Sequence, residues 1–156
     1  MVEINEEYFV EELLFDELEI GMEFPATTYA LSEETISKYI DVVDDRNPLY
    51  TDEDAAKKAG LGGVIAPAAS ICLFTKPSNI LGGLKPKKRP PSGSIHAAQK
   101  YEFIDIIRPG DVITLKSKVS DKYLKKGRQY VHMKTDCYNS NGEKVAVSEN
   151  IGIWAK

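Results

Sequence analysis

Hydrophobic and polar positions alternate along most of the second half of the chain, with the period of two that is typical of β-strands. The pattern covers residues 94–107, 112–119, 129–138 and 144–154. Turn-forming sequences separate these segments, at residues 108–111, 125–128 and 139–142. The carboxy-terminal half is therefore expected to form an antiparallel sheet.

The first half has a helical pattern after one expected strand at residues 26–31. Ser32 is a candidate N-cap for a helix that runs to Val43 with one apolar stripe. Thr51, with an aspartate three positions later, predicts the cap of a second, short helix that stops at Gly60. The amino-terminal extension, residues 1–19, is also expected to be helical, because Tyr8, Phe9, Leu13 and Leu14 have helix-like spacing.

The most apolar segment runs from Ala68 to Lys76 and follows Pro67, which suits the first turn of a helix. Because this segment is apolar on every side, it is expected to be a core helix wrapped by the sheet. Residues 77–93 are rich in Pro, Gly and Lys and predict a long irregular loop. Helices followed by a block of strands indicate a single α+β domain over residues 1–156.

Composition excludes several classes of function. The chain has 156 residues, of which 20 are basic and 24 acidic, so its net charge of −4 does not favour nucleic acid or an anionic membrane. No apolar run reaches the ~20 residues of a membrane-spanning helix, and the acidic amino terminus is unlike a signal peptide, so a cytoplasmic location is expected. Cys72 and Cys137 lack metal-site spacing and are expected to be two buried thiols, with no metal bound.

The most informative motif is Asp-Arg-Asn-Pro-Leu-Tyr at residues 45–50. Taken alone, an Asn-Pro turn of this kind could merely connect two helices. Here it is followed by a short helical segment, by Gly-Gly-Val-Ile-Ala-Pro at residues 62–67 and by His-Ala-Ala-Gln at residues 96–99. In this order the motifs resemble the MaoC-like (R)-specific hydratases and dehydratases, and within them the FAS1-like amino-terminal branch.

The resemblance implies a hot-dog fold, a long central helix in an antiparallel sheet, that dimerises edge to edge with itself or with a related hot-dog subunit. It implies a hydro-lyase of fatty acid metabolism that reversibly hydrates 2-enoyl thioesters and dehydrates 3-hydroxyacyl thioesters. Coenzyme A or phosphopantetheine on an acyl carrier protein is then part of the substrate, and no further cofactor is expected.

Three residues are expected to be catalytic. The family's pattern places an aspartate where Asp45 stands and a histidine where Tyr50 stands. A phenol ordinarily titrates near 10 and an imidazole near 6.5, so Tyr50 can donate a hydrogen bond but is a poor base. His96 is the candidate replacement, with a partly buried structural histidine as the alternative. If His96 is the base, it is expected to meet Asp45 in one cleft near the start of the Ala68 helix.

The resemblance also implies a set of substrate-binding residues: Asn47, Pro67, Ala68, Ala69 and Gln99. Backbone amides at Ala68 and Ala69 are expected to stabilise the thioester oxyanion, because the first amides of a helix have no intrahelical acceptor. The cations Lys85, Lys87, Lys88 and Arg89 are expected either to bind the phosphates of the carrier from a mobile loop or to form an ordinary solvated loop.

Two other functions remain open at this point. The tyrosine at position 50 also fits a non-catalytic, substrate-holding subunit that pairs with a catalytic hot-dog partner. An acyl-CoA thioesterase would share the fold and the ligand. The second histidine, His132, lies in an alternating strand pattern and is expected on a solvated sheet face.

Overall fold

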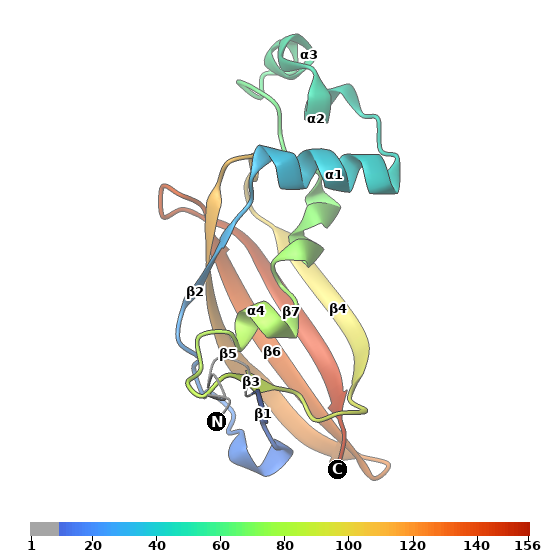
Figure 1. Cartoon of the computed structure of the whole chain (residues 1–156), viewed down its shortest axis with the longest axis vertical. Coiled ribbons are helices and arrows are strands. Elements are labelled where there is room, and N and C mark those ends of the chain that lie inside the picture. The colour runs from blue at the N-terminus through green and yellow to red at the C-terminus, as the bar shows by residue number, and fades with distance from the viewer. Residues whose placement is uncertain (1–9) are drawn as a thin grey trace, which may run out of the picture.

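The computed structural model of the protein describes residues 10–156, and one antiparallel sheet dominates it. Its strand order is β2-β5-β6-β7-β4. The strands are β2 (Thr27–Ala30), β4 (Ile95–Phe103), β5 (Val112–Lys125), β6 (Arg128–Tyr138) and β7 (Lys144–Trp154). Figure 1 shows the sheet curving behind a series of short helical segments. The α+β architecture expected from the hydrophobic pattern is confirmed.

The hairpin between β5 and β6 is longer than its pattern predicts. The ladder continues past a β-bulge between Val119 and Asp121 and closes only at Lys125 and Arg128. The bulge adds one residue to β5 and so interrupts the period of two on which the strand prediction relied. The expected turn is present, with positive φ angles of 50° at Lys126 and 74° at Gly127 that suit a two-residue hairpin loop.

Three helices lie beyond one end of the sheet (Figure 1): α1 (Glu33–Val43), α2 (Pro48–Thr51) and α3 (Glu53–Lys58). Ser32 caps α1 as expected, because its Oγ accepts a hydrogen bond from the Thr35 amide at 3.1 Å. The expected cap at Thr51 is wrong. Asp52 caps α3 instead, because its carboxylate accepts hydrogen bonds from the amides of Asp54 and Ala55.

The continuous helix expected over residues 68–76 is not present. The segment forms a 3₁₀ helix, η3 (Ala68–Leu73), a turn, and then the short helix α4 (Pro77–Ile80). η3 ends at Leu73, and Pro77 holds the preceding Lys76 extended, with ψ at 153°, so η3 and α4 do not join into one helix. The side-chain amide of Asn79 then donates to the carbonyl oxygens of Leu73 and Phe74, which stabilises the break.

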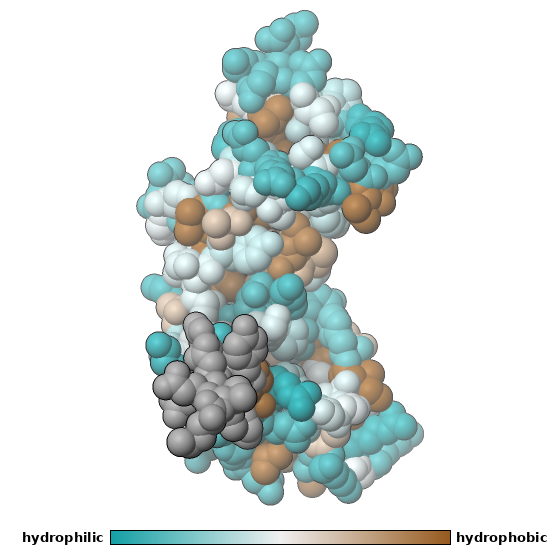
Figure 2. Space-filling model, in the orientation of Figure 1, coloured by the Kyte–Doolittle hydropathy of each residue, from teal (hydrophilic) through white to brown (hydrophobic). Residues whose placement is uncertain are grey.

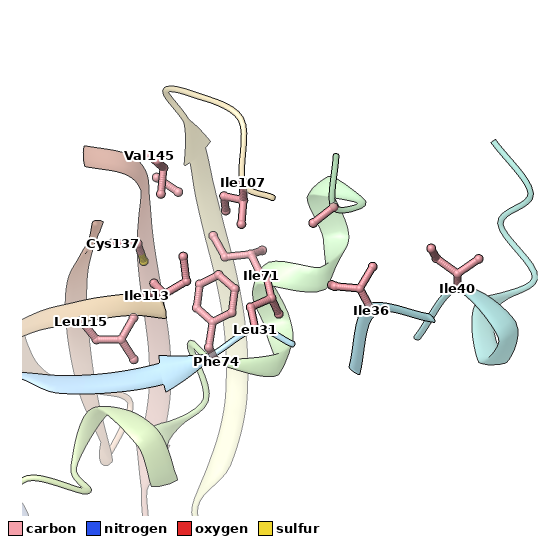
Figure 3. Packing of buried hydrophobic residues seen from close by; sticks show 12 residues of the cluster. Leu31, Ile36, Ile40, Ile71, Phe74, Ile107, Ile113, Leu115, Cys137 and Val145 are labelled. Carbon is pink, nitrogen blue, oxygen red and sulfur yellow. The ribbon is translucent and has the colours of Figure 1, made fainter. Parts of the chain in front are cut away.

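Only one face of η3 and the turn after it is buried, so burial on every side is also wrong. Ile71 and Phe74 are fully buried and Figure 3 shows them pointing toward the sheet residues Ile113 and Leu115. Each such side chain contributes about 1.5–3 kcal/mol by leaving water. On the opposite face, Ala68, Ala69 and Cys72 are exposed. The expected thiol burial therefore holds for Cys137 and is wrong for Cys72.

A second hydrophobic cluster joins the amino-terminal segment to the far end of the sheet. Leu13, Phe15 and Leu18 are buried there, in contact with a cluster that includes Met133 and Trp154. In the described part of the extension the chain forms a strand, β1 (Glu11–Glu12), and a 3₁₀ turn, η2 (Phe15–Glu17), so the expected helix is wrong for residues 10–19. Tyr8 and Phe9 lie outside the described residues.

The segment of residues 77–93 is also more ordered than expected. It contains α4 and a short strand, β3 (Lys88–Arg89), which pairs in parallel with β1. Within residues 10–156, no helix has the length and apolar character that crossing a membrane requires.

Candidate active site around Tyr39 and Asp45

The loop that follows α1 positions Asp45. Asp44 adopts the left-handed conformation, with φ at 52°, and ends the helix. Asp45 is exposed, and its Oδ1 accepts a hydrogen bond from the Asn47 amide at 3.3 Å. The Asn47 side chain in turn accepts one from the Leu49 amide at 3.0 Å and caps α2, where Pro48 is the first residue. The side chains of Asp45 and Asn47 therefore stabilise the backbone of the motif, and the Asp45 carboxylate is exposed to solvent.

Tyr39, on α1, lies near polar side chains from distant parts of the chain. Partial burial raises the pKa of Tyr39, and nearby acidic groups raise it further. In decreasing order of effect these groups are Cys72, Asp45, Tyr101 and Tyr50. They come from η3, the motif loop, β4 and α2. Tyr39 therefore remains a protonated hydrogen-bond donor well above neutral pH.

On the β4 side, the group of side chains around Tyr39 includes Tyr101. Its hydroxyl lies 3.5 Å from Oγ1 of the buried Thr75, which donates a hydrogen bond to the Ile71 carbonyl at 2.9 Å. Figure 2 shows the surface hollowed below α1 on the side of β4, with apolar residues near its rim. Tyr101 thereby connects the group of side chains around Tyr39 to the turn that follows η3.

Four of the residues expected to bind substrate lie at the start of η3 and on β4. Pro67 is buried at the start of η3, while Ala68 and Ala69 are exposed on its first turn. The Gln99 amide is already occupied by β7, because its Nε2 donates to Ser148 Oγ at 2.7 Å and its Oε1 accepts from Asn150 Nδ2 at 3.3 Å. Gln99 is therefore held by the sheet.

The described chain does not bring His96 to Asp45, so the expected single cleft is not present within it. His96 lies at the start of β4, opposite Gly152, and its Nε2 is 3.1 Å from the Ala98 carbonyl oxygen. It lines a separate cavity of about 350 Å³ together with Trp154. That end of β4 lies far along the sheet from α1 (Figure 1). The sequence between Asp45 and His96 does not predict this separation, because the separation depends on how β4 is oriented relative to α1.

His132 also differs from its expectation, because it is largely covered instead of solvated. Its Nδ1 lies 3.2 Å from Glu149 Oε1, and its Nε2 lies 3.3 Å from the hydroxyl of Tyr123. Burial alone would raise the pKa of Glu149, but the hydrogen bond from His132 and the charge of Lys100 lower it overall. This group lies on the sheet face opposite η3.

The basic loop is only partly available to phosphates. Lys88 and Arg89 are paired with acidic residues of β1 and η2, at 2.8 Å from Lys88 to Glu11 and 3.2 Å from Arg89 to Glu12. The hydrogen bond to Glu11 raises the pKa of Lys88. Lys88 and Arg89 are therefore held in β3, and the expectation of a mobile loop is wrong for these two cations. Lys85 and Lys87 are exposed.

A second groove, of about 650 Å³, lies between α1 and the segment of residues 62–64, and Tyr50 and Arg108 line it. The Arg108 guanidinium donates hydrogen bonds to the carbonyls of Leu61, Gly63 and Val64, and so holds the segment that leads to η3. Sequence reasoning treated Arg108 only as part of a turn. The sequence also provides no reason to single out Tyr39, within the helical pattern that ends at Val43, or Tyr101, which has the same position in the strand period as Gln99.

Comparisons with known proteins identify the family of the chain. Residues 19–148 match the family described as "FAS1-like, dehydratase domain region". The chain therefore belongs to this family, whose general class is that of the hydratases and dehydratases with a hot-dog fold. A curated relative, a "UPF0336 protein" from Streptomyces avermitilis, is 28% identical over 138 residues, covering 87% of this chain and 92% of the relative.

Solved structures show the same fold. The R-hydratase PhaJ1 from Pseudomonas aeruginosa superposes with a TM-score of 0.72 at 24% identity, covering 94% of this chain and 88% of that chain. The HadBC (3R-hydroxyacyl-ACP dehydratase) complex from Mycobacterium tuberculosis gives a TM-score of 0.72 at 18% identity, with coverage of 85% and 94%. The hot-dog architecture implied by the motifs is confirmed.

Proposed function

We propose that the protein is a subunit of an acyl-thioester hydratase or dehydratase in which Asp45 transfers a proton and a second hot-dog chain supplies the histidine. One observation carries the proposal: Asp45 is exposed and close enough to Tyr39 to raise its pKa, and both histidines, His96 and His132, lie elsewhere in the described chain. Membership of the FAS1-like dehydratase family supports the reaction class.

The chemistry requires two proton-transfer groups. In hydration, a base removes a proton from water as the oxygen adds to C3 of the enoyl thioester, and an acid delivers a proton to C2. Dehydration is the reverse. Asp45 is a suitable carrier for one of these protons because it is exposed and held by the Asn47 turn. Tyr50 is a poor second carrier, because the ordinary pKa of a phenol is near 10.

Tyr39 and Tyr101 are suited to binding the thioester group of the substrate. Tyr39 and Tyr101 present hydroxyl donors beside apolar surface, and a phenol that stays protonated donates to a thioester carbonyl without adding charge. Such donors stabilise the oxyanion that develops on the thioester when C2 carries negative charge.

A second candidate function is a non-catalytic subunit that only holds the substrate for a catalytic partner. Tyr50, at the position where the family's pattern has histidine, is the observation that favours it. In this case Asp45 has no part in proton transfer, and the same hollow binds the acyl group.

The test is hydration of a short trans-2-enoyl-CoA, followed by loss of the absorbance of the conjugated thioester. The purified protein is assayed alone and after reconstitution with a histidine-bearing hot-dog chain, with Asp45→Asn as the matched variant in both. Activity that depends on Asp45 supports the proposal. Activity of the mixture that is unchanged in Asp45→Asn assigns the holding role, and inactivity in every combination overturns both functions.

A further inference from the structure

The cavity that His96 and Trp154 line has the size of a small-molecule site. Its volume is about 350 Å³, and sites for small ligands have about 300–1,000 Å³. Trp154 and Met133, which both line it, belong to the same hydrophobic cluster as Ile80 of α4. The cavity therefore lies on the face of the sheet that α4 covers, and Figure 1 shows α4 in front of β6 and β7.

Two buried side chains at this cavity each have a polar atom without a hydrogen-bond partner. Asn150 is only 4% exposed, and its Nδ2 donates to Gln99 Oε1 at 3.3 Å, but its Oδ1 accepts no hydrogen bond from the residues that the structure describes. Trp154 is only 3% exposed, and its Nε1–H donates to none of these residues either. Buried polar groups are nearly always paired, so the cavity offers one acceptor and one donor to a ligand.

The two free atoms lie on the same side of β7. Asn150, Gly152 and Trp154 alternate along the strand, so their side chains lie on one face of it. The indole of Trp154 turns back over Gly152, because a Cβ at position 152 would lie 3.1 Å from Trp154 Nε1. The donor is thus held above a residue that is about 7 Å along the strand from Asn150. One small ligand can bond both atoms from one side.

This arrangement selects the chemistry of the ligand. A ligand that bonds both atoms from one side must carry an N–H and a C=O on the same edge. A cyclic amide has such an edge, because the ring holds the N–H and the C=O on one side. A linear secondary amide is trans and holds them on opposite sides, so the linear amides of a phosphopantetheine arm do not fit.

The walls of the cavity favour a flat and neutral molecule. Met133, Pro91 and Ile95 line it and provide apolar surface for a ring. No carboxylate of the described chain lines it, and the guanidinium of Arg89 is already paired with Glu12 at 3.2 Å. A ligand with a net charge would therefore lack a free counter-charge there.

The segment that closes the cavity is held in place by the protein itself. The Glu12 carboxylate accepts a hydrogen bond from the Ser92 amide at 2.8 Å, and Ser94 Oγ accepts one from the Ala155 amide at 3.0 Å. Ser92 and Ser94 both line the cavity. A wall that is already ordered lowers the entropy cost of binding.

From these observations we infer that the cavity binds a neutral, flat cyclic amide. The N–H of the ligand donates to Asn150 Oδ1, and its carbonyl oxygen accepts a hydrogen bond from Trp154 Nε1. The site requires neither Asp45 nor a second chain, and so it goes beyond the proposed function.

A titration with 2-pyridone, a flat cyclic amide, tests the site. Trp154 is the single tryptophan of the chain, so a ¹⁵N–¹H spectrum contains one indole signal, which reports directly on the proposed donor. We expect 2-pyridone to shift this signal in a saturable way. A cavity that holds only water gives no saturable shift, and this result would overturn the inference.

Three related molecules test the recognised edge in the unchanged protein. N-methyl-2-pyridone lacks the N–H, and 4-pyridone carries its N–H and C=O at opposite ends of the ring. Each is expected to bind at least about tenfold more weakly than 2-pyridone, because one hydrogen bond to a buried group is lost. N-methylacetamide, a linear amide, is expected to give no saturable shift. Equal binding of any of the three would overturn the inference.

Substitution of Asn150 tests the proposed acceptor. Asn150→Leu removes Oδ1 at similar volume and is expected to weaken binding of 2-pyridone at least about tenfold. Asn141→Leu, the same change in an exposed turn, is the matched control and is expected to leave the affinity unchanged. Unchanged affinity in Asn150→Leu would overturn the inference. The comparison of ligands remains decisive if this variant does not fold, because it uses the wild-type chain.

Discussion

Lys88 Nζ lies 2.8 Å from Glu11 Oε2, although the two residues are 77 positions apart in the sequence. The contact joins β3 to β1 and is flanked by backbone hydrogen bonds from Glu11 to Lys87 and from Leu13 to Arg89. A cation that the composition of the loop suggests for phosphate binding is thereby used to attach the amino-terminal segment. Of the four cations expected to bind phosphate, Lys85 and Lys87 are the two that these contacts with β1 do not involve.

Lys88→Ala is expected to lower the melting temperature by a few degrees and to make the amino-terminal segment more sensitive to proteolysis. The physical reason is the loss of both carboxylate contacts, to Glu11 and to Glu17. Lys85→Ala is the matched control and is expected to leave stability unchanged because Lys85 is exposed. Equal effects of the two substitutions would contradict the assignment of Lys88 to a structural role.

Phe74→Ala is expected to destabilise the fold by about 3–5 kcal/mol, measured by denaturant unfolding. Phe74 is fully buried between η3 and the sheet and contacts the ring of Tyr29, with centroids 5.9 Å apart. Cys72→Ala, on the exposed face of the same segment, should change stability by no more than about 0.5 kcal/mol. A large loss at Cys72 would mean that the segment is buried on both faces.

Glu149 should make stability depend on acid pH. Its pKa in the folded state is lowered by His132, Lys100 and Ser120, so its stabilisation is fully present above the unfolded value of about 4.3 and is lost as the pH falls through the folded value. The difference in melting temperature between the wild type and Glu149→Gln is therefore expected to shrink between about pH 5 and pH 3. A difference that stays constant over this range would contradict the prediction.

In a dimer or complex that is active, Asp45→Asn is expected to reduce hydration by about 10²–10⁴-fold, the usual range for a proton-transfer residue. Tyr50→Phe, which removes one hydroxyl, is expected to cost only about fivefold, the equivalent of one hydrogen bond of about 1 kcal/mol. The measurement is kcat/KM for a 2-enoyl-CoA. An effect of Tyr50→Phe as large as that of Asp45→Asn would instead make Tyr50 a proton carrier.

Much of the fold was determined by local pattern. The alternation after residue 93 predicted four strands, and Ser32 predicted the start of α1. These features depend on residues close together in sequence, where turn chemistry and period leave few alternatives. The family resemblance, carried by the same motifs, correctly indicated the hot-dog fold.

What only the tertiary structure decided depends on contacts between distant segments. Composition made residues 68–76 a candidate core helix, but Pro77 and Asn79 end it early, and the sheet covers only one of its faces. Likewise, no local pattern indicates that Glu11 of β1 pairs with Lys88, or that His96 lies at the end of β4 far from α1. Distances across a sheet follow from strand order and register, which arise from packing of the whole chain, and a pattern along one strand does not contain them.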